Sequence, residues 1–348
     1  MTKHAIAIAE LLERMVSAGA SDLHVGSNLS PRLRIEGRLI ELDAAPLDRE
    51  ALGAWVATIL DPAQLAVYAQ RGDVDFGIDG GDGERYRVSL YRERGNDTLA
   101  IRRLASRIPS MEEIGLPLTP QGWTHLEQGL ILVTGPTGCG KSTTIASMVQ
   151  DINARKAVHI VTIEDPIEYL LPPGEATVQQ REIGSDVDSF PRAVRAALRE
   201  DVDVLVVGEL RDPETMAAAL AVAETGHLVF ATLHTNSAEQ AIDRIIDAFR
   251  DEEQPLIRSR LSATLVGVIY QRLVLPANGT RIAAFEVLAA NSAVRNLIRE
   301  GKTFQIPNTM VTGTAYGMQT MAAALASLAE AGSLSTLEVE TFLRSNPL

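Results

Sequence analysis

The hydrophobic and polar positions follow one pattern in the first third of the chain and another in the rest. Up to about residue 104, short stretches alternate apolar and polar residues, which is typical of strands with one buried face, and helical periods lie between them. We therefore expect a small α+β domain that opens with a helix. Its later elements are a strand at 21–25, a hairpin at 31–42 turning at Glu36 and Gly37, helical stretches at 52–60 and 61–72, and strands at 74–78, 85–94 and 98–104.

From about residue 128 the strands become continuously apolar and alternate with helical patterns, which predicts a parallel sheet covered on both faces. These strands are expected at 129–135, 159–165, 202–209 and 227–235. After about residue 255 the pattern favours helices, with a short strand around 281–288. The stretch between the two patterns carries three prolines and no sustained period. We expect a first domain at 1–104, a linker at 105–127 and a second domain at 128–348.

Composition and charge limit the kinds of molecule that the protein can bind. The chain has 348 residues, 32 basic against 45 acidic, for a net charge of −13, so its surface as a whole should repel nucleic acid. A single cysteine, Cys139, excludes an intramolecular disulfide and fits a reducing compartment. The N-terminal pattern lacks the apolar core of a signal peptide, and no apolar run reaches membrane-spanning length. We expect a cytoplasmic protein without direct nucleic-acid binding, which reaches the membrane only through partners.

The segment GPTGCGKSTT at 135–144 satisfies the phosphate-loop pattern G-x-x-x-x-G-K-[ST]. A predicted strand precedes it and a predicted helix follows, so the helix N-terminus faces the phosphates. The expected ligands are ATP and Mg²⁺, with Lys141 on the β- and γ-phosphates and the Ser142 hydroxyl on the metal. Because Cys139 lies beside this helix N-terminus, we expect its pKa to be lowered. The residues expected to bind nucleotide are Gly135, Pro136, Thr137, Gly138, Cys139, Gly140, Lys141, Ser142 and Thr143.

Acidic residues end two of the predicted buried strands. Glu164, Asp165 and Glu168 come at the end of the strand at 159–165, and Glu209 ends the strand at 202–209. Ligands bind at the carboxyl ends of strands in open α/β sheets, and phosphoryl transfer to water needs a carboxylate and oxygen ligands for Mg²⁺. A solvated turn is the alternative for the first group. Glu209 stands where aspartate is usual, and it can hold Mg²⁺ through a water or act on the nucleophile.

Three further side chains are candidates for the same site. His234 follows the strand at 227–235 and can sense the γ-phosphate through a hydrogen bond in its neutral form. The first domain carries a group of arginines, of which Arg85 and Arg87 share one strand face because they are two residues apart. Most of these arginines are expected to be a solvated edge. However, an arginine supplied from outside the phosphate loop accelerates phosphoryl transfer by roughly 10³–10⁵.

Taken together, these motifs resemble the secretion ATPases, the hexameric motors of type II secretion and type IV pili, and within them the pilus retraction ATPases. The resemblance rests on SDLHV, RYRV, GPTGCGKSTT, TIEDPIEY, LREDVDVLVVGELRD, AETGHLVFATLHTNSA, AVRNLIRE and GMQT, so it covers nearly the whole chain. It implies a PAS-like N-terminal domain followed by a RecA-like ATPase domain with a helical C-terminal region. It also implies a homo-hexamer that docks on an inner-membrane platform protein, with a paralogous pilus ATPase as a further partner.

The resemblance also implies roles for single residues. Glu168 matches the catalytic acid of an acidic segment that includes Glu164 and Asp165, Glu209 matches the glutamate of the second nucleotide motif, and Arg87 and Arg102 match paired arginines that reach the nucleotide. His234 matches the histidine segment. The leading interpretation is a cytoplasmic ATPase that powers pilus retraction and twitching motility. The alternatives are a pilus assembly or type II secretion ATPase and an accessory nucleotide-binding regulator of a partner motor; a DNA-translocating ring is opposed by the charge.

Overall fold

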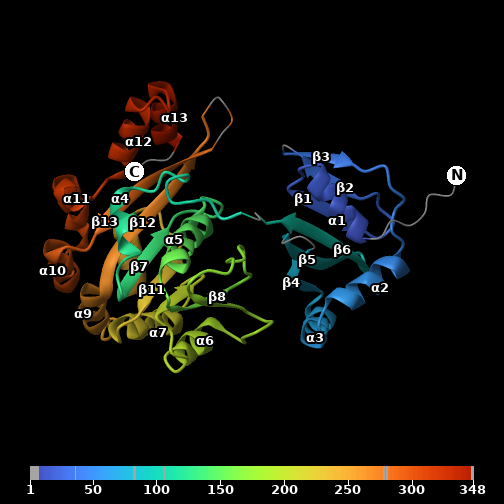
Figure 1. The fold of residues 1–348 in the computed structure, drawn as a ribbon, viewed down its shortest axis with the longest axis horizontal. Coiled ribbons are helices and arrows are strands. Elements are labelled where there is room, and N and C mark those ends of the chain that lie inside the picture. The colour runs from blue at the N-terminus through green and yellow to red at the C-terminus, as the bar shows by residue number, and fades with distance from the viewer. Residues whose placement is uncertain are drawn as a thin grey trace. The chain divides into compact units, whose positions relative to one another are not determined.

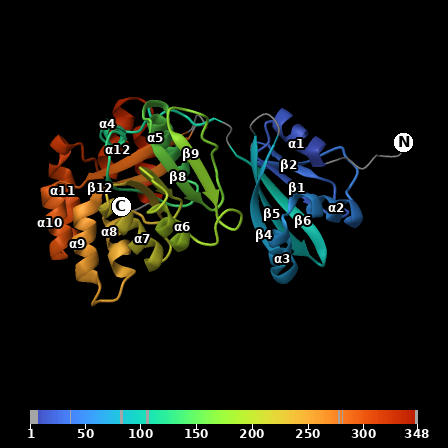
Figure 2. The same cartoon turned by 60° about the horizontal axis from the view of Figure 1, so that its bottom comes forward.

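The computed structural model describes residues 8–35, 37–80, 84–104, 107–276, 279 and 281–345. The chain divides into two units, each with its own sheet and core (Figures 1 and 2). The first unit contains residues 1–107 and two short later segments, 166–170 and 182–186, and the second unit contains the rest. Among the described residues, no helix combines the length and the apolar character needed to cross a membrane.

The first unit is built on a six-stranded antiparallel sheet with the strand order β3-β2-β1-β6-β5-β4. Every element that the alternating pattern predicts is present, including the β2–β3 hairpin, although Glu36 at its turn lies outside the described residues. The elements are α1 (Ile8–Ser17), β1 (Asp22–Gly26), β2 (Arg32–Ile35), β3 (Arg38–Glu41), α2 (Arg49–Ile59), α3 (Pro62–Arg71), β4 (Asp73–Asp79), β5 (Arg85–Glu93) and β6 (Asn96–Arg103).

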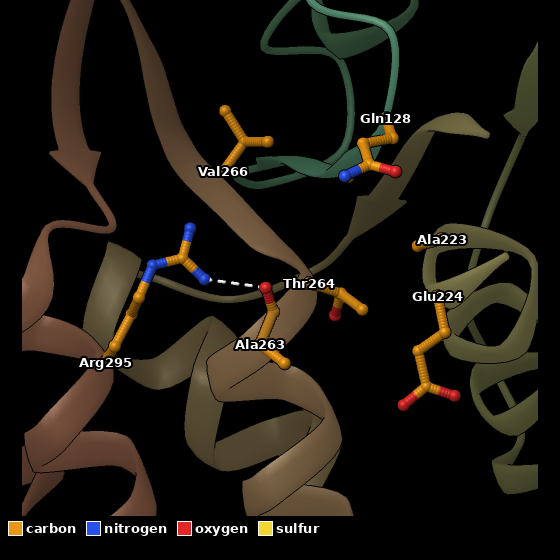
Figure 3. A pocket seen from close by; sticks show the side chains of 8 residues that line it. Gln128, Ala223, Glu224, Ala263, Thr264, Val266 and Arg295 are labelled. Atoms are coloured by element: carbon orange, nitrogen blue, oxygen red, sulfur yellow. Dashed lines mark hydrogen bonds between the residues drawn. The ribbon is translucent and has the colours of Figure 1, made fainter. Parts of the chain in front are cut away.

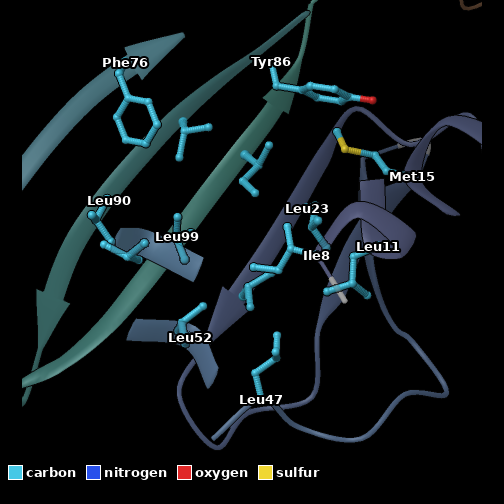
Figure 4. Packing of buried hydrophobic residues seen from close by; sticks show 14 of the residues in the cluster. Ile8, Leu11, Met15, Leu23, Leu47, Leu52, Phe76, Tyr86, Leu90 and Leu99 are labelled. Atoms are coloured by element: carbon cyan, nitrogen blue, oxygen red, sulfur yellow. The ribbon is translucent and has the colours of Figure 1, made fainter. Parts of the chain in front are cut away.

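Alternation along these strands divides the sheet into an apolar face and a charged face. On the apolar face, Leu23, Leu90 and Leu99 pack with Leu11 of α1 and Leu52 of α2, all of them fully buried (Figure 4). Polar residues of neighbouring strands share the other face because they are direct partners in the strand register. The central row of this face consists of Arg34, Asp22, Arg102 and Arg87, which oppose one another across β2, β1, β6 and β5.

The second unit is built on a seven-stranded sheet with the order β13-β12-β7-β11-β10-β8-β9. The strands from β12 to β8 in this order are parallel to one another, and β13 is antiparallel to β12. The elements up to the last strand are α4 (Leu118–Trp123), β7 (Gly129–Thr134), α5 (Lys141–Arg155), β8 (His159–Glu164), β9 (Thr177–Glu182), α6 (Phe190–Ala197), β10 (Val204–Val207), α7 (Pro213–Glu224), β11 (Leu228–Leu233), α8 (Ala238–Asp247), α9 (Gln254–Thr264), β12 (Leu265–Val274) and β13 (Ile282–Ala289).

Helices complete the chain after the sheet, with two short 3₁₀ turns among them. They are α10 (Ser292–Glu300), η2 (Thr303–Gln305), α11 (Ile306–Thr312), η3 (Thr314–Tyr316), α12 (Met321–Glu330) and α13 (Thr336–Ser345). The predicted fold class, a mixed α/β chain with a RecA-like sheet and a helical C-terminal region, is confirmed. The four continuously apolar stretches are β7, β8, β10 and β11, as expected.

Helices cover both faces of the parallel strands. Ile131 of β7 and Phe230 of β11 are neighbours in register and pack with Met148 and Ile152 of α5 in one buried cluster. The residues between them along the same strands face the other way, where α7 and α8 contact β7. Residues 108–127, most of the stretch expected as a linker, also belong to this unit: Met111, Leu116 and Trp123 are buried in the same cluster as α5.

One prediction for the region after residue 255 is wrong. The stretch 265–274 was expected to be helical, but it forms the ten-residue strand β12 beside β7. Periodicity cannot separate a fully buried strand from a buried helix, because both are continuously apolar. The shorter strand expected around 281–288 is confirmed as β13.

A half-buried carboxylate of β13 joins two helices of the second unit. One oxygen of Glu286 accepts the backbone N–H of Ala238 at 2.8 Å, and the other accepts that of Met321 at 3.2 Å. These two residues begin α8 and α12, so one side chain caps the first turns of both helices. Burial raises the pKa of Glu286, and the two backbone N–H groups oppose that shift.

Candidate nucleotide-binding site

The predicted phosphate loop lies between β7 and α5 and is shaped by a residue of β12. A Cβ atom at Gly135 would approach the Gln271 carbonyl oxygen to 2.4 Å, and one at Gly140 would come within 2.9 Å of the Gln271 amide nitrogen. Gly140 also has a φ of 92°, in the left-handed region that favours glycine. Gln271 is itself buried and accepts a 2.7 Å hydrogen bond from Thr144 of α5. Both glycines are therefore required by the close packing of the loop on β12.

Lys141, the first residue of α5, turns back over this loop. Its ammonium group donates to the carbonyl oxygens of Gly135 at 2.8 Å and Pro136 at 3.2 Å. Only 8% of the residue is exposed. Ser142 and Thr143 follow in the first turn of α5, where backbone N–H groups have no partner within the helix. The loop thus places the Lys141 ammonium group at the N-terminal end of α5.

His234 lies between Lys141 and Glu209, the predicted acidic residue that follows β10. Its Nδ1 lies 3.4 Å from the Lys141 Nζ, and its Nε2 lies 3.3 Å from a Glu209 oxygen. The other Glu209 oxygen accepts from Arg211 at 2.7 Å. Burial, followed by the charge of Lys141, lowers the pKa of His234, which favours the neutral ring with Nε2–H donating to Glu209. The structure therefore brings together Lys141, His234 and Glu209.

Glu164 lies at the same end of the parallel strands as Glu209. It ends β8, which pairs with β10, and the Gly208 N–H donates to the Ile163 carbonyl at 2.8 Å, so Glu164 and Glu209 follow neighbouring strands. Thr162 and Gln180 donate to the Glu164 carboxylate at 2.6 and 3.3 Å. Asp165 follows directly as the last residue of the second unit before segment 166–170.

The remaining predicted side chains belong to the first unit. Glu168 lies in segment 166–170, and Arg87 and Arg102 are register partners on the charged face of the sheet. Arg102 donates to Asp22 at 2.8 Å, whereas Arg87 lies 3.8 Å from Asp75. The expected common face of Arg85 and Arg87 agrees with the strand register, in which they oppose Asp79 and Gly77 of β4. A role of Glu168, Arg87 and Arg102 at the nucleotide stays a prediction.

The expectation for Cys139 is wrong. Its side chain is buried within the loop, and an added Cβ at Gly135 would lie 2.7 Å from its sulfur. Burial raises the pKa of the thiol, and the charge of Lys141 opposes this shift without reversing it. The helix N-terminus is therefore outweighed by desolvation, and the cysteine acts as a small apolar residue of the loop.

A pocket beside the loop was not anticipated from the sequence. It has a volume of about 540 Å³ and is lined on one side by Gly140, Thr143 and Gln271. Its other walls come from residues 112–115, from β13 and from Leu328 of α12. The sequence signal was Gln271 itself, a polar residue directly after the apolar run LVGVIY.

The segment AVRNLIRE forms α10 with the predicted apolar residues Val294 and Ile298 fully buried. The amphipathic pattern of this segment, with Val294, Leu297 and Ile298 apolar, predicts that Arg295 points outward, and this prediction is wrong. Its guanidinium donates to the carbonyl oxygens of Ser262 at 2.7 Å and Ala290 at 2.9 Å. It also donates to the carbonyl oxygen of Ala263 at 2.7 Å, the bond drawn in Figure 3. Arg295 thus caps the C-terminal end of α9, beside a cavity of about 250 Å³.

The sequence matches one protein family over most of its length. The profile described as Type II/IV secretion system protein covers residues 3–300. The chain therefore belongs to this family.

Within the family the chain is most usefully compared with pilus motors. It is 41% identical over 328 residues to the type IV pilus retraction ATPase PilT of Pseudomonas aeruginosa, covering 94% of this chain and 95% of the relative. It is 42% identical over 304 residues to a twitching motility protein of Neisseria gonorrhoeae, covering 87% and 81%. A crystal structure of the pilus retraction motor PilT with bound ADP superposes with a TM-score of 0.89 at 41% identity, over 96% of both chains. The predicted resemblance to the retraction ATPases is confirmed.

Proposed function

We propose that this chain is an ATPase that converts ATP hydrolysis into the retraction of type IV pili, the activity behind twitching motility. The observation that carries this proposal is the linked set of Lys141, His234 and Glu209 over a phosphate loop of the secretion family. A lysine, a neutral histidine and a carboxylate in contact can register the γ-phosphate and transmit its loss to β10 and β11. Such a relay suits a motor, since a motor must couple a bond-breaking step to movement.

The loop residues are proposed to hold the nucleotide. Backbone N–H groups from Gly135 to Thr143 surround the phosphates, and Lys141 exchanges its bonds to the loop carbonyls for bonds to phosphate oxygens. The pocket lined by Gly140, Thr143 and Gln271 has room for the nucleoside. ATP is therefore the substrate we propose for this site.

Mg²⁺ is the proposed cofactor. Hydroxyl and carboxylate oxygens, here Ser142 and Glu209, are donors that Mg²⁺ accepts, and the ion also needs phosphate oxygens because it rarely occupies an all-protein site. This fits the structure: among the described residues, no three acidic, histidine or cysteine side chains gather into a metal site of their own. When bound, the ion would neutralise charge on the phosphates.

The chemical step is assigned to the carboxylates and arginines. Glu168 is proposed to orient the attacking water, with Glu164 and Asp165 completing the acidic segment, and Arg87 and Arg102 to stabilise charge on the transferred phosphoryl group. His234 donates a hydrogen bond from Nε2 to Glu209. Its Nδ1 accepts a hydrogen bond from Lys141 and can lose this bond as the γ-phosphate leaves. Each of these roles predicts loss of turnover with retained nucleotide binding.

We further propose that the chain works as a homo-hexameric ring on the cytoplasmic side of the inner membrane. It would dock on the platform protein of the pilus machine, with a paralogous pilus ATPase as a further partner, and would touch the membrane only through them. The family resemblance and the absence of a membrane-spanning helix among the described residues support this arrangement.

Deleting the gene and counting surface pili tests the direction of the motor. A retraction motor predicts many pili without twitching, and re-expression of the chain restores motility, whereas the Lys141→Ala variant does not. Bald cells would instead indicate a pilus assembly ATPase. Full piliation and normal motility, with a purified protein that binds ATP but does not turn it over, would indicate an accessory regulator.

A further inference from the structure

A buried ion pair in the first unit has no role in the site described so far. Arg85 of β5 donates to Glu182 at 2.6 Å, and only 11% and 8% of the two side chains are exposed. Buried charges of this kind are costly unless further hydrogen bonds complete them. Arg85 belongs to the first unit. Glu182 is the last residue of β9, and it is grouped with the first unit because segment 182–186 belongs there.

Two of the further bonds converge on one residue of segment 166–170, and Arg85 also forms an ion pair with Asp79 of β4. The Glu182 oxygen that binds Arg85 also accepts the Ile167 N–H at 3.1 Å, and the Arg85 Nε donates to the Ile167 carbonyl oxygen, also at 3.1 Å. The second Glu182 oxygen accepts the Gly77 N–H at 3.1 Å. The pair therefore holds Ile167 by both its backbone groups. We call Gly77, Arg85 and Glu182 the Ile167 clamp.

Gly77 is the residue that makes room for the clamp. A Cβ atom there would lie 2.6 Å from the Arg85 Nη2 and 3.0 Å from a Glu182 oxygen. Both atoms are held in the ion pair, so neither can withdraw without breaking it. Since the Gly77 N–H is also a donor to Glu182, the glycine is needed for the close approach of β4 to the carboxylate.

We propose that Arg85 and Glu182 are positioning residues that fix the acidic segment and so aim Glu168. This inference rests on the proposed function, in which Glu168 orients the attacking water. Glu168 directly follows Ile167, whose side chain is buried as well. With the Ile167 peptide fixed by a donor and an acceptor, the placement of the Glu168 carboxylate depends mainly on its own side-chain torsions.

Loss of the clamp should slow hydrolysis without weakening nucleotide binding. Displacing a catalytic group by about 1 Å costs up to roughly 10²-fold in rate. In Glu182→Gln the amide keeps the shape but loses the charge. One of its two oxygen positions becomes an NH2 donor, so either the Gly77 N–H or the pair of donors on Arg85 and Ile167 loses its acceptor. We expect its kcat to fall about 10- to 100-fold, while the Kd for a fluorescent ADP analogue stays within about twofold. Gly77→Ala should have the same effect.

A second buried pair of the same unit provides the matched control. Glu84 accepts two bonds from Arg103, each at 2.6 Å, with 14% and 26% of the side chains exposed, and neither bond involves segment 166–170. Glu84→Gln removes the same kind of charge. It should lower the melting temperature of the full-length protein but leave kcat unchanged.

Single-turnover hydrolysis in two backgrounds separates a positioning role from a general structural one. If the clamp acts through the Glu168 carboxylate, Glu182→Gln slows the otherwise wild-type protein but adds little to Glu168→Gln. Equal slowing in both backgrounds, or a kcat that falls only together with nucleotide affinity, would overturn the clamp. Unchanged kcat in Glu182→Gln and Gly77→Ala would overturn it as well. Normal hydrolysis by Glu168→Gln would instead remove the proposed catalytic role, whatever the clamp variants do.

Discussion

Replacing Arg295 by alanine should destabilise the second unit. The guanidinium donates three hydrogen bonds to carbonyl oxygens, two at the end of α9 and one just before α10. Because the C-terminal carbonyls of a helix have no partner within it, Arg295 satisfies acceptors that the backbone leaves open. Burial lowers the pKa of Arg295, so the protein holds this charge at some desolvation cost.

The size of the effect follows from the number of bonds and from the adjoining cavity. Hydrogen bonds to a charged group contribute about 1.5–3 kcal/mol each when their loss leaves the partner dry. Here the cavity of about 250 Å³ beside Arg295 gives water access to the freed carbonyls. We therefore expect a total loss near the value of one or two such bonds, about 2–3 kcal/mol. For a unit of this size that lowers the melting temperature by roughly 4–12 °C.

Differential scanning fluorimetry without nucleotide measures this directly, and Arg299→Ala is the control. Arg299 is exposed on the last turn of the same helix, so its removal should change stability by less than about 0.5 kcal/mol. Arg295→Lys keeps the charge but replaces the planar guanidinium fork by a single ammonium group, which cannot match the positions of Nε and Nη1 together, and it should lie between alanine and wild type. An Arg295→Ala variant that melts with the wild type would refute the capping role.

Three further outcomes are expected. Glu168→Gln and Glu209→Gln should each abolish steady-state ATP hydrolysis while a fluorescent nucleotide still binds, and normal turnover in both would contradict the acidic site. A maleimide should label Cys139 at least about tenfold more slowly in the native protein than in urea, since burial keeps the thiol neutral, and fast native labelling would contradict this. The folded-state pKa of His234 is lowered, so the stability it contributes is present above the unfolded pKa of about 6.5 and is lost as the pH falls below it. In His234→Gln, the free energy of unfolding measured in urea should therefore fall less between pH 7 and 5 than in the wild type. An unchanged slope would refute the shift.

Local patterns predicted the elements of the first unit because most strands there have one buried face. The alternation in RYRVSLYRER gives both the strand β5 and the common face of Arg85 and Arg87. Continuously apolar runs assigned four of the parallel strands of the second unit. The fifth, β12, was missed, because the apolar run LVGVIY at its start does not distinguish a strand from a helix and its pairing with β7 depends on residues about 135 positions away.

The site was predictable where chemistry is local and not where it depends on packing. The phosphate loop follows from its spacing, since glycines and a lysine must occupy fixed positions. The contacts of Gln271 with that loop, the raised pKa of Cys139 and the inward Arg295 all depend on neighbours distant in sequence. The pairing of Arg85 with Glu182 belongs to the same class, because 97 residues separate them.

The shared cap at Glu286 makes two helices mechanically dependent on each other. One rigid carboxylate holds the first turn of α8 with one oxygen and the first turn of α12 with the other. A hydrogen bond tolerates a few tenths of an ångström before it weakens, so a larger shift of α8 must either drag the carboxylate or release α12. The helix α8 begins four residues after His234. A displacement at the end of β11 beside the phosphate loop would therefore be passed through Glu286 to the first turn of α12.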